Sequence, residues 1–112
     1  WGTAGSAEGE FYFPHGLAIG PGGHVFVADT ASARIQEFSP DGAFVSTWGK
    51  PGGGDGEFIY PTALDIDAEG YIYVADTGNH RIQKFTAAVS RPNHLVKTQS
   101  TIARLASWAY LE

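Results

Sequence analysis

The clearest pattern in this sequence is an alternation of apolar and polar residues that appears twice. Residues 27–38 contain Val-Ala-Asp-Thr followed, after three residues, by Arg-Ile-Gln-Glu-Phe. Residues 74–85 repeat this arrangement 47 residues later, with Lys in place of Glu. In each copy an isoleucine lies between an arginine and a glutamine, which is the alternation expected of a β-strand with one buried face.

The same period of two, interrupted by turn-forming residues, predicts four strands in each copy. Turns such as the Gly-Pro-Gly-Gly cluster of residues 20–23 separate the strands, because glycine accepts positive φ values. Between the turns β-branched and aromatic residues are frequent, as in strands. The predicted strands are Gly16–Ile19, His24–Ala28, Arg34–Phe38 and Ala43–Trp48, then Ala63–Ile66, Tyr71–Ala75 and Arg81–Phe85.

The repetition extends well beyond the doubled stretch. Residues 1–39 align without a gap on residues 48–86, and 18 of the paired residues are identical. A repeat length in the forties is typical of β-propellers and repeat arrays, in which each unit is one supersecondary element. We therefore predict one all-β domain over residues 1–112. It contains two four-stranded antiparallel blades, at about residues 10–48 and 58–100.

Three motifs make the repeat resemble a known family. They are Gly-x-Phe-x-x-Pro-x-Gly-Leu-Ala in residues 9–18, Val-Ala-Asp-Thr in residues 74–77, and Asn-His-Arg-Ile-Gln-Lys-Phe in residues 79–85. The chain resembles NHL repeats from residue 1 to about residue 86, although the first copy keeps only the Arg-Ile part of Asn-His-Arg-Ile. The resemblance implies a β-propeller with one repeat per blade, often with six blades.

The segment after residue 86 departs from the repeat. Residues 95–100 fit a displaced last strand of the second blade. Within residues 101–110, Ile102, Leu105 and Ala109 recur at helical spacing behind a suitable N-cap, Ser100, so we predict a short C-terminal helix. The alternative is that residues 87–112 are foreign or disordered sequence.

Two blades leave two faces without a neighbour, because a blade packs both of its faces against adjacent blades. If each free face exposed about 300 Å² of apolar surface, about 15 kcal/mol of burial would be lost at ~25 cal/mol per Å². That loss is comparable with the whole stability of a domain. Head-to-tail contacts can close into a ring. We therefore expect a six-bladed homotrimer, and the alternative is a piece of a longer propeller.

Charge and composition exclude several classes of function. The chain has no cysteine, so it has no disulfide and no thiol nucleophile. It has no apolar run of about 18 residues and no signal-peptide pattern, so we expect no membrane segment, and the compartment stays open. Residues 1–86 carry four basic and eleven acidic residues, a net charge of −7, against −5 for the whole chain. Such a surface repels phosphate, so we expect no nucleic-acid partner.

The charged residues of the doubled stretch are Asp29 and Arg34, with Asp76 and Arg81 as their equivalents. A carboxylate at a strand end accepts hydrogen bonds from loop N–H groups, and an arginine five residues later can pair with it. A ligand-binding pair is the alternative, but chemistry at a unique site rarely needs two equal copies. We predict a structural pair that is repeated in each blade.

Positions where the two copies differ are better candidates for function. His15 stands opposite Thr62, and Asp65 stands opposite Ala18, on the strand that would line the propeller channel. In a trimer, copies of His15 and Asp65 would converge and could hold a divalent metal. A histidine in water at the rim and a structural aspartate are the simpler interpretations.

A further candidate is the loop that precedes Arg81. It carries Asn79 and His80, which stand opposite Ser32 and Ala33 in the first copy. The fold therefore does not require their side chains, and we expect them to be exposed, where they could contact a partner.

These features favour a binding or assembly module that recognises a protein or a small ligand through its loop faces. Related propellers include metal-dependent lyases and lactone hydrolases, so an enzyme with a metal on the axis is the alternative. We expect no other cofactor. A truncated product with no role beyond self-assembly is the remaining interpretation.

Overall fold

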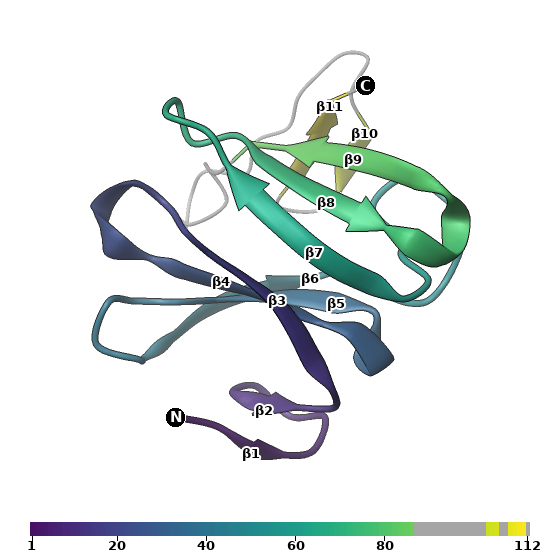
Figure 1. The fold of residues 1–112 in the computed structure, drawn as a ribbon. Helices are drawn as coiled ribbons and strands as arrows, with labels where there is room; N and C mark the ends of the chain where they lie inside the picture. The colour runs from purple at the N-terminus through teal and green to yellow at the C-terminus, as the bar shows by residue number, and fades with distance from the viewer. Residues whose placement is uncertain (87–102, 106–107, 112) are drawn as a thin grey trace.

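The computed structural model describes residues 1–86, 103–105 and 108–111, and strands form most of it (Figure 1). No helix in this part of the chain is long and apolar enough to cross a membrane. The strands are β1 (Thr3–Ala4), β2 (Glu10–Phe11), β3 (Pro14–Ile19), β4 (Val25–Asp29), β5 (Arg34–Phe38), β6 (Phe44–Trp48), β7 (Pro61–Ile66), β8 (Ile72–Asp76), β9 (Arg81–Phe85), β10 (Ala103–Leu105) and β11 (Trp108–Leu111). Three short 3₁₀ turns connect them, η1 (Pro21–Gly23), η2 (Thr30–Ser32) and η3 (Thr77–Asn79).

The first repeat forms a four-stranded antiparallel sheet in the order β3-β4-β5-β6. The second repeat places β7, β8 and β9 in the same order and in the equivalent register. Both sheets have an irregularity at the same point of the first strand, between Pro14 and Gly16 and between Pro61 and Ala63. The predicted all-β fold and its antiparallel sheets are confirmed, and the sheets are consistent with propeller blades.

The second sheet differs from the prediction at its outer edge. It has five strands in the order β10-β11-β9-β8-β7, and Tyr110 of β11 pairs with Phe85 of β9. The short helix predicted within residues 101–110 is therefore wrong, because strands β10 and β11 occupy this segment. A helix of this length is marginal without tertiary support, whereas β9 offers an unpaired edge and residues 108–111 include aromatics that favour strands. The displaced last strand predicted at residues 95–100 lies outside the described residues.

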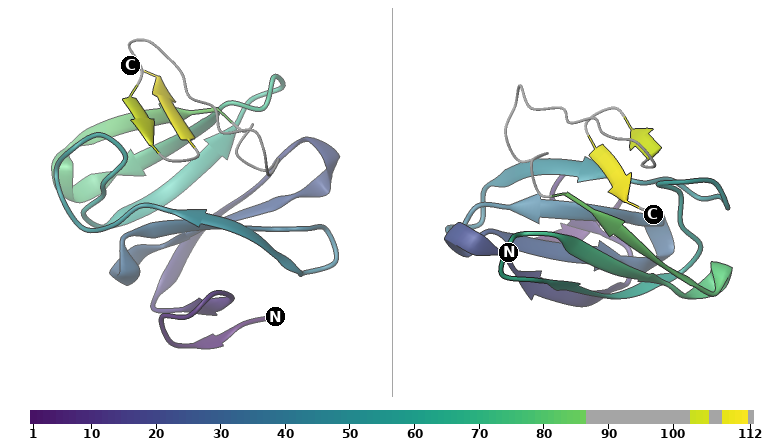
Figure 2. Two further views of the ribbon diagram at one scale, coloured as in Figure 1. Left: turned by 180° about the vertical axis from the view of Figure 1, so that it is seen from behind. Right: turned by 90° about the horizontal axis from the view of Figure 1, so that it is seen from above.

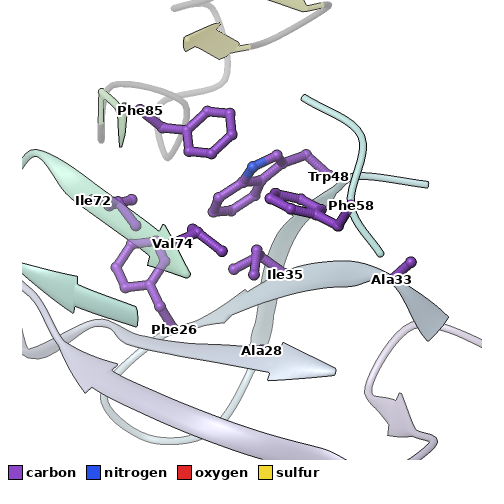
Figure 3. Packing of buried hydrophobic residues seen from close by; sticks show 9 residues of the cluster. All are labelled: Phe26, Ala28, Ala33, Ile35, Trp48, Phe58, Ile72, Val74 and Phe85. Atoms are coloured by element: carbon purple, nitrogen blue, oxygen red, sulfur yellow. The ribbon is translucent and has the colours of Figure 1, made fainter. Parts of the chain in front are cut away.

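The two sheets pack face to face, and the main hydrophobic core lies between them (Figures 1 and 3). Trp48 joins both sheets, because its ring lies 6.4 Å from Phe26 and 5.6 Å from Phe85 between centroids. Phe58, which arrives from the connection between the repeats, lies 5.9 Å from Phe85 and is fully buried. The buried members of this core are Phe26, Ala28, Ala33, Ile35, Trp48, Phe58, Ile72, Val74 and Phe85.

Each sheet has two distinct faces. The front face carries Phe26, Ala28 and Ile35 in the first sheet and Tyr73, Ala75 and Ile82 in the second. The back face carries Leu17, Ile19, Val25, Val27 and Phe38 in the first sheet and Leu64, Ile66, Ile72, Val74 and Phe85 in the second. The front of the first sheet packs on the back of the second. In the part of the chain that the structure describes, no blade packs on the other front, and only the N-terminal segment and Phe44 pack on the other back.

The N-terminal segment lies over the back of the first sheet, on the side away from the second sheet (Figures 1 and 2). Trp1 and Phe11 each lie 5.6 Å from Phe38 between ring centroids. Trp1 thus repeats the position that Trp48 takes on Phe85. This segment covers the outer part of the back face and leaves Leu17 and Ile19 exposed, at 61% and 58%.

We predict that Gly16→Ala lowers the free energy of unfolding by about 1–3 kcal/mol. The first strands of the two sheets approach each other at this point, and an added Cβ would lie 2.7 Å from Ala63 Cα and 2.9 Å from the Thr62 carbonyl oxygen. Backbone atoms cannot yield as a flexible side chain would. Urea unfolding measures the change. Gly53→Ala is the matched control, because its Cβ would meet only Asn79 Oδ1 at 3.6 Å, and an equal loss in both variants would contradict the tight approach.

Candidate functional site

A buried carboxylate follows the second strand of each sheet. Asp29 and Asp76 end β4 and β8, and both side chains are fully buried. Asp29 Oδ1 accepts a hydrogen bond from the Tyr12 N–H at 2.6 Å, and Asp76 Oδ1 accepts one from the Ile59 N–H at 2.8 Å. Each carboxylate therefore ties the long loop before the first strand of a repeat to the loop between the second and third strands.

An arginine completes this connection in both repeats. Arg34 Nε donates to Asp29 Oδ2 at 3.0 Å, and Arg81 Nε donates to Asp76 Oδ2 at 2.8 Å. The remaining guanidinium nitrogens donate to three loop carbonyl oxygens in each repeat, those of Ser6, Ala7 and Glu10 and those of Gly53, Gly54 and Glu57. Five donors in a rigid fork suit such a cluster of acceptors.

A pair of buried glutamines belongs to the same network. Gln36 accepts from the Gly9 N–H at 2.9 Å and donates to the Glu10 carbonyl oxygen at 2.7 Å. Gln83 makes the equivalent bonds and also donates to Asp76 Oδ2 at 3.0 Å. Sequence reasoning missed these two residues as network members, although both lie in the doubled stretch beside the arginines. Their amides satisfy loop groups that would otherwise be buried without partners.

The network leaves these charged groups little capacity for a ligand. Both aspartates use both oxygens, and each arginine bonds a carboxylate and three carbonyls. Asn79, predicted as an exposed contact residue, donates to the Gly52 carbonyl oxygen and to Asp76 Oδ2, and it is half-buried. His80 is exposed at the loop tip with a left-handed φ of 57°. Of this loop pair, only the His80 side chain points to solvent.

The candidate metal ligands lie on the first strands of the two sheets. His15 is exposed at the irregularity of β3, and its equivalent Thr62 shares a hydrogen bond of 2.7 Å with Thr77. Asp65 is exposed on β7, where its Oδ1 accepts the N–H of Ile66 at 2.9 Å. Among the described residues of one chain, no three His, Asp or Glu side chains cluster as a metal site. A metal on the axis would need ligands from several chains.

The pKa of one half-buried carboxyl at the end of the second sheet, that of Asp67, is lowered by its neighbours. Asp67 accepts the Tyr71 N–H and the Tyr73 hydroxyl, each at 2.9 Å. Partial burial raises the pKa of Asp67, but these hydrogen bonds and the charge of Lys84 outweigh it and hold the pKa below its ordinary value of 3.8. The Lys84 ammonium lies 4.5 Å from the centre of the Tyr71 ring. Tyr73 is thus fixed on the front face by its own hydroxyl.

Comparison with known families identifies the repeat. The family model described as NHL repeat matches residues 11–38 and 58–85, which are the two strand-loop units joined by the aspartate network. This chain belongs to the NHL-repeat family. No curated protein matches the NHL chain.

The NHL units also present exposed aromatic side chains just before their first strands. Tyr12, Phe13 and Tyr60 are 59%, 66% and 61% exposed. Phe13 and Tyr60 occupy equivalent positions with left-handed φ values of 70° and 58°, which bulky residues rarely adopt. The aspartate network holds the adjoining backbone in this conformation. Rigid loops thus display apolar side chains at one end of both sheets.

We predict that Asp29→Asn and Asp76→Asn each lower the free energy of unfolding by about 3 kcal/mol, because each change leaves a largely buried arginine without its carboxylate. Urea unfolding followed by tryptophan fluorescence gives the values. Asp55→Asn makes the same change of charge at an exposed position and should be nearly neutral. Equal stability of all three variants would show that the network is not what secures the loops.

Proposed function

We propose that this chain is a binding and assembly module, whose two NHL blades combine with those of other copies into a propeller that recognises a protein or a small ligand through its loops. The observation that carries the proposal is a pair of sheet faces that the described residues leave open, the front of the second sheet and the β3 part of the back of the first. A scaffold with stapled loops suits recognition better than a mobile one.

A ring of three chains is the assembly that we favour. It would supply six blades, and each free front would meet a free back. Large apolar side chains at the two free faces, with Ile82 63% and Leu17 61% exposed, are unusual for a monomer. The exposed aromatics before β3 and β7 would then recur six times around one end of the ring and form its recognition surface.

The charge of the repeats favours a protein or neutral ligand over nucleic acid. Residues 1–86 carry a net charge of −7, and a phosphate backbone would be repelled by such a surface. An enzymatic role is less well supported, because the arginine and aspartate side chains of both repeats are used by the loops.

Light scattering coupled to gel filtration tests the assembly. We expect a mass of about 36 kDa, which is three chains of 11.9 kDa. The mass should be unchanged on several-fold dilution in the micromolar range. A folded monomer would refute the proposed oligomeric propeller.

Metal analysis separates the binding module from the enzymatic alternative. After purification without added metal, we expect the content of zinc, manganese and calcium to stay below about one ion per three chains. One ion per three chains that is lost in His15→Ala or Asp65→Asn, with the mass of the assembly unchanged, would instead favour a metal-dependent enzyme on the axis.

A further inference from the structure

The uncovered front of the second sheet is a shallow apolar hollow. Ala63, Asp65, Tyr73, Ala75 and Ile82 of this face line it. The equivalent residues Phe26, Ala28 and Ile35 of the first sheet are at most 2% exposed, because the second sheet covers them. Ala75 and Ile82 are identical to Ala28 and Ile35, their equivalents in the first sheet. Tyr73 differs from Phe26 only by its hydroxyl, which already donates a hydrogen bond to Asp67.

The back of the first sheet carries nearly the same side chains as the covered back of the second, and its Leu17 and Ile19 on β3 are exposed, while Val25, Val27 and Phe38 are buried under the N-terminal segment and Phe44. Leucine, valine and phenylalanine recur at three equivalent positions, and isoleucine at a fourth. The single change is Val25 for Ile72, one methylene smaller. The flanking rings are also shared, because Trp1 packs on Phe38 as Trp48 packs on Phe85. A front that fits one back should therefore fit the other.

We infer that the front of the second sheet binds the back of the first sheet of another copy of this chain, with β7 of one copy beside β3 of the next. This rests on the proposed oligomeric propeller and specifies the surfaces that build it. The internal contact supplies the template, since it already joins a front and a back of the same chain. The contact is head-to-tail, so each copy uses two different surfaces.

The polar groups of the free front have partners inside their own sheet, which permits burial. Tyr73 bonds Asp67, the Lys84 ammonium lies over the Tyr71 ring, and Asp65 Oδ1 accepts the Ile66 N–H. Tyr73, Ala75 and Ile82 between them offer apolar surface to a partner. Tyr73 and Lys84 therefore need no charged group on the opposing face, and the Asp65 carboxylate lies on the edge strand β7.

The inferred contact also differs from the internal one at its tightest place. Gly16 lets β3 approach β7 within the chain, and a Cβ there would lie 2.7 Å from Ala63 Cα. The equivalent position of the free front is Ala63, which already has that Cβ. Two copies should therefore sit slightly farther apart at this point than the two sheets of one chain, and the contact should be weaker than its template.

Two exposed residues allow the contact to be tested without disturbing the chain that carries them. Ile82→Asp places a charge on the free front, and Leu17→Asp places one on the free back. Each variant should be a folded monomer, with the dissociation constant of the assembly raised by roughly a hundredfold or more. Tyr12→Asp is the control, because Tyr12 is similarly exposed at 59% but lies over the β4–β5 loop, where its carbonyl accepts the Ala31 N–H.

Mixing the two monomeric variants gives the decisive result. The Leu17→Asp chain keeps an intact front on its second sheet, and the Ile82→Asp chain keeps an intact back on its first sheet. A head-to-tail contact therefore predicts a 1:1 dimer, which light scattering should report at about 24 kDa, twice 11.9 kDa. Formation of this dimer also shows that both variants are folded. A dimer of Leu17→Asp alone would indicate front-to-front pairing and would overturn the inference.

Ala63→Gly provides an independent test of the register. It removes the Cβ that separates the copies, so we expect the dissociation constant of the assembly to fall by about tenfold. No tightening would contradict the placement of β7 beside β3. An unmutated chain that is monomeric would refute the proposed propeller itself, whereas an oligomer indifferent to both aspartate variants would refute only these surfaces.

Discussion

The packing of one blade's front on the next blade's back is the contact on which this structure depends. A single sheet of three or four short strands buries too little apolar surface to be stable alone. Here the front of the first sheet and the back of the second supply most of the main core. The Trp48 side chain lies beside an aromatic ring of each sheet, Phe26 of the first and Phe85 of the second. The same geometry explains why apolar residues remain exposed, because each sheet has a second face that the described residues cover only in part or not at all.

The hydrogen-bond network around Asp29 and Asp76 serves this packing. Loops that cross from one blade to the next must bring Phe11 and Phe58 into contact with the sheet that follows, and their backbone groups lose water in doing so. The buried carboxylates, arginines and glutamines replace that water with fixed partners. Repetition of the whole set in both units is the reason to regard these charges as structural.

Equivalent positions of the two repeats carry different residues where packing between sheets no longer constrains the side chain. The fully covered front of the first sheet has Gly16 at its closest approach, while the open front of the second has Ala63 and Asp65. The loop tips differ in the same way, with buried Ala33 against exposed His80. Surfaces that meet water or another molecule tolerate such changes, and any recognition specificity would reside there.

The sequence alone determined the strand-rich class, the two units and their 47-residue offset, because alternation and turn residues act locally and an ungapped repeat is visible without a structure. It also indicated the Asp–Arg pairs, but not the glutamines, whose partners lie 26 and 27 residues away in the chain. The helix predicted for the C-terminal segment is wrong, because three apolar positions at helical spacing carry no information about the strand edge that β9 offers for pairing. Only the tertiary structure decided which face of each sheet is covered, since that depends on long-range packing rather than on local pattern.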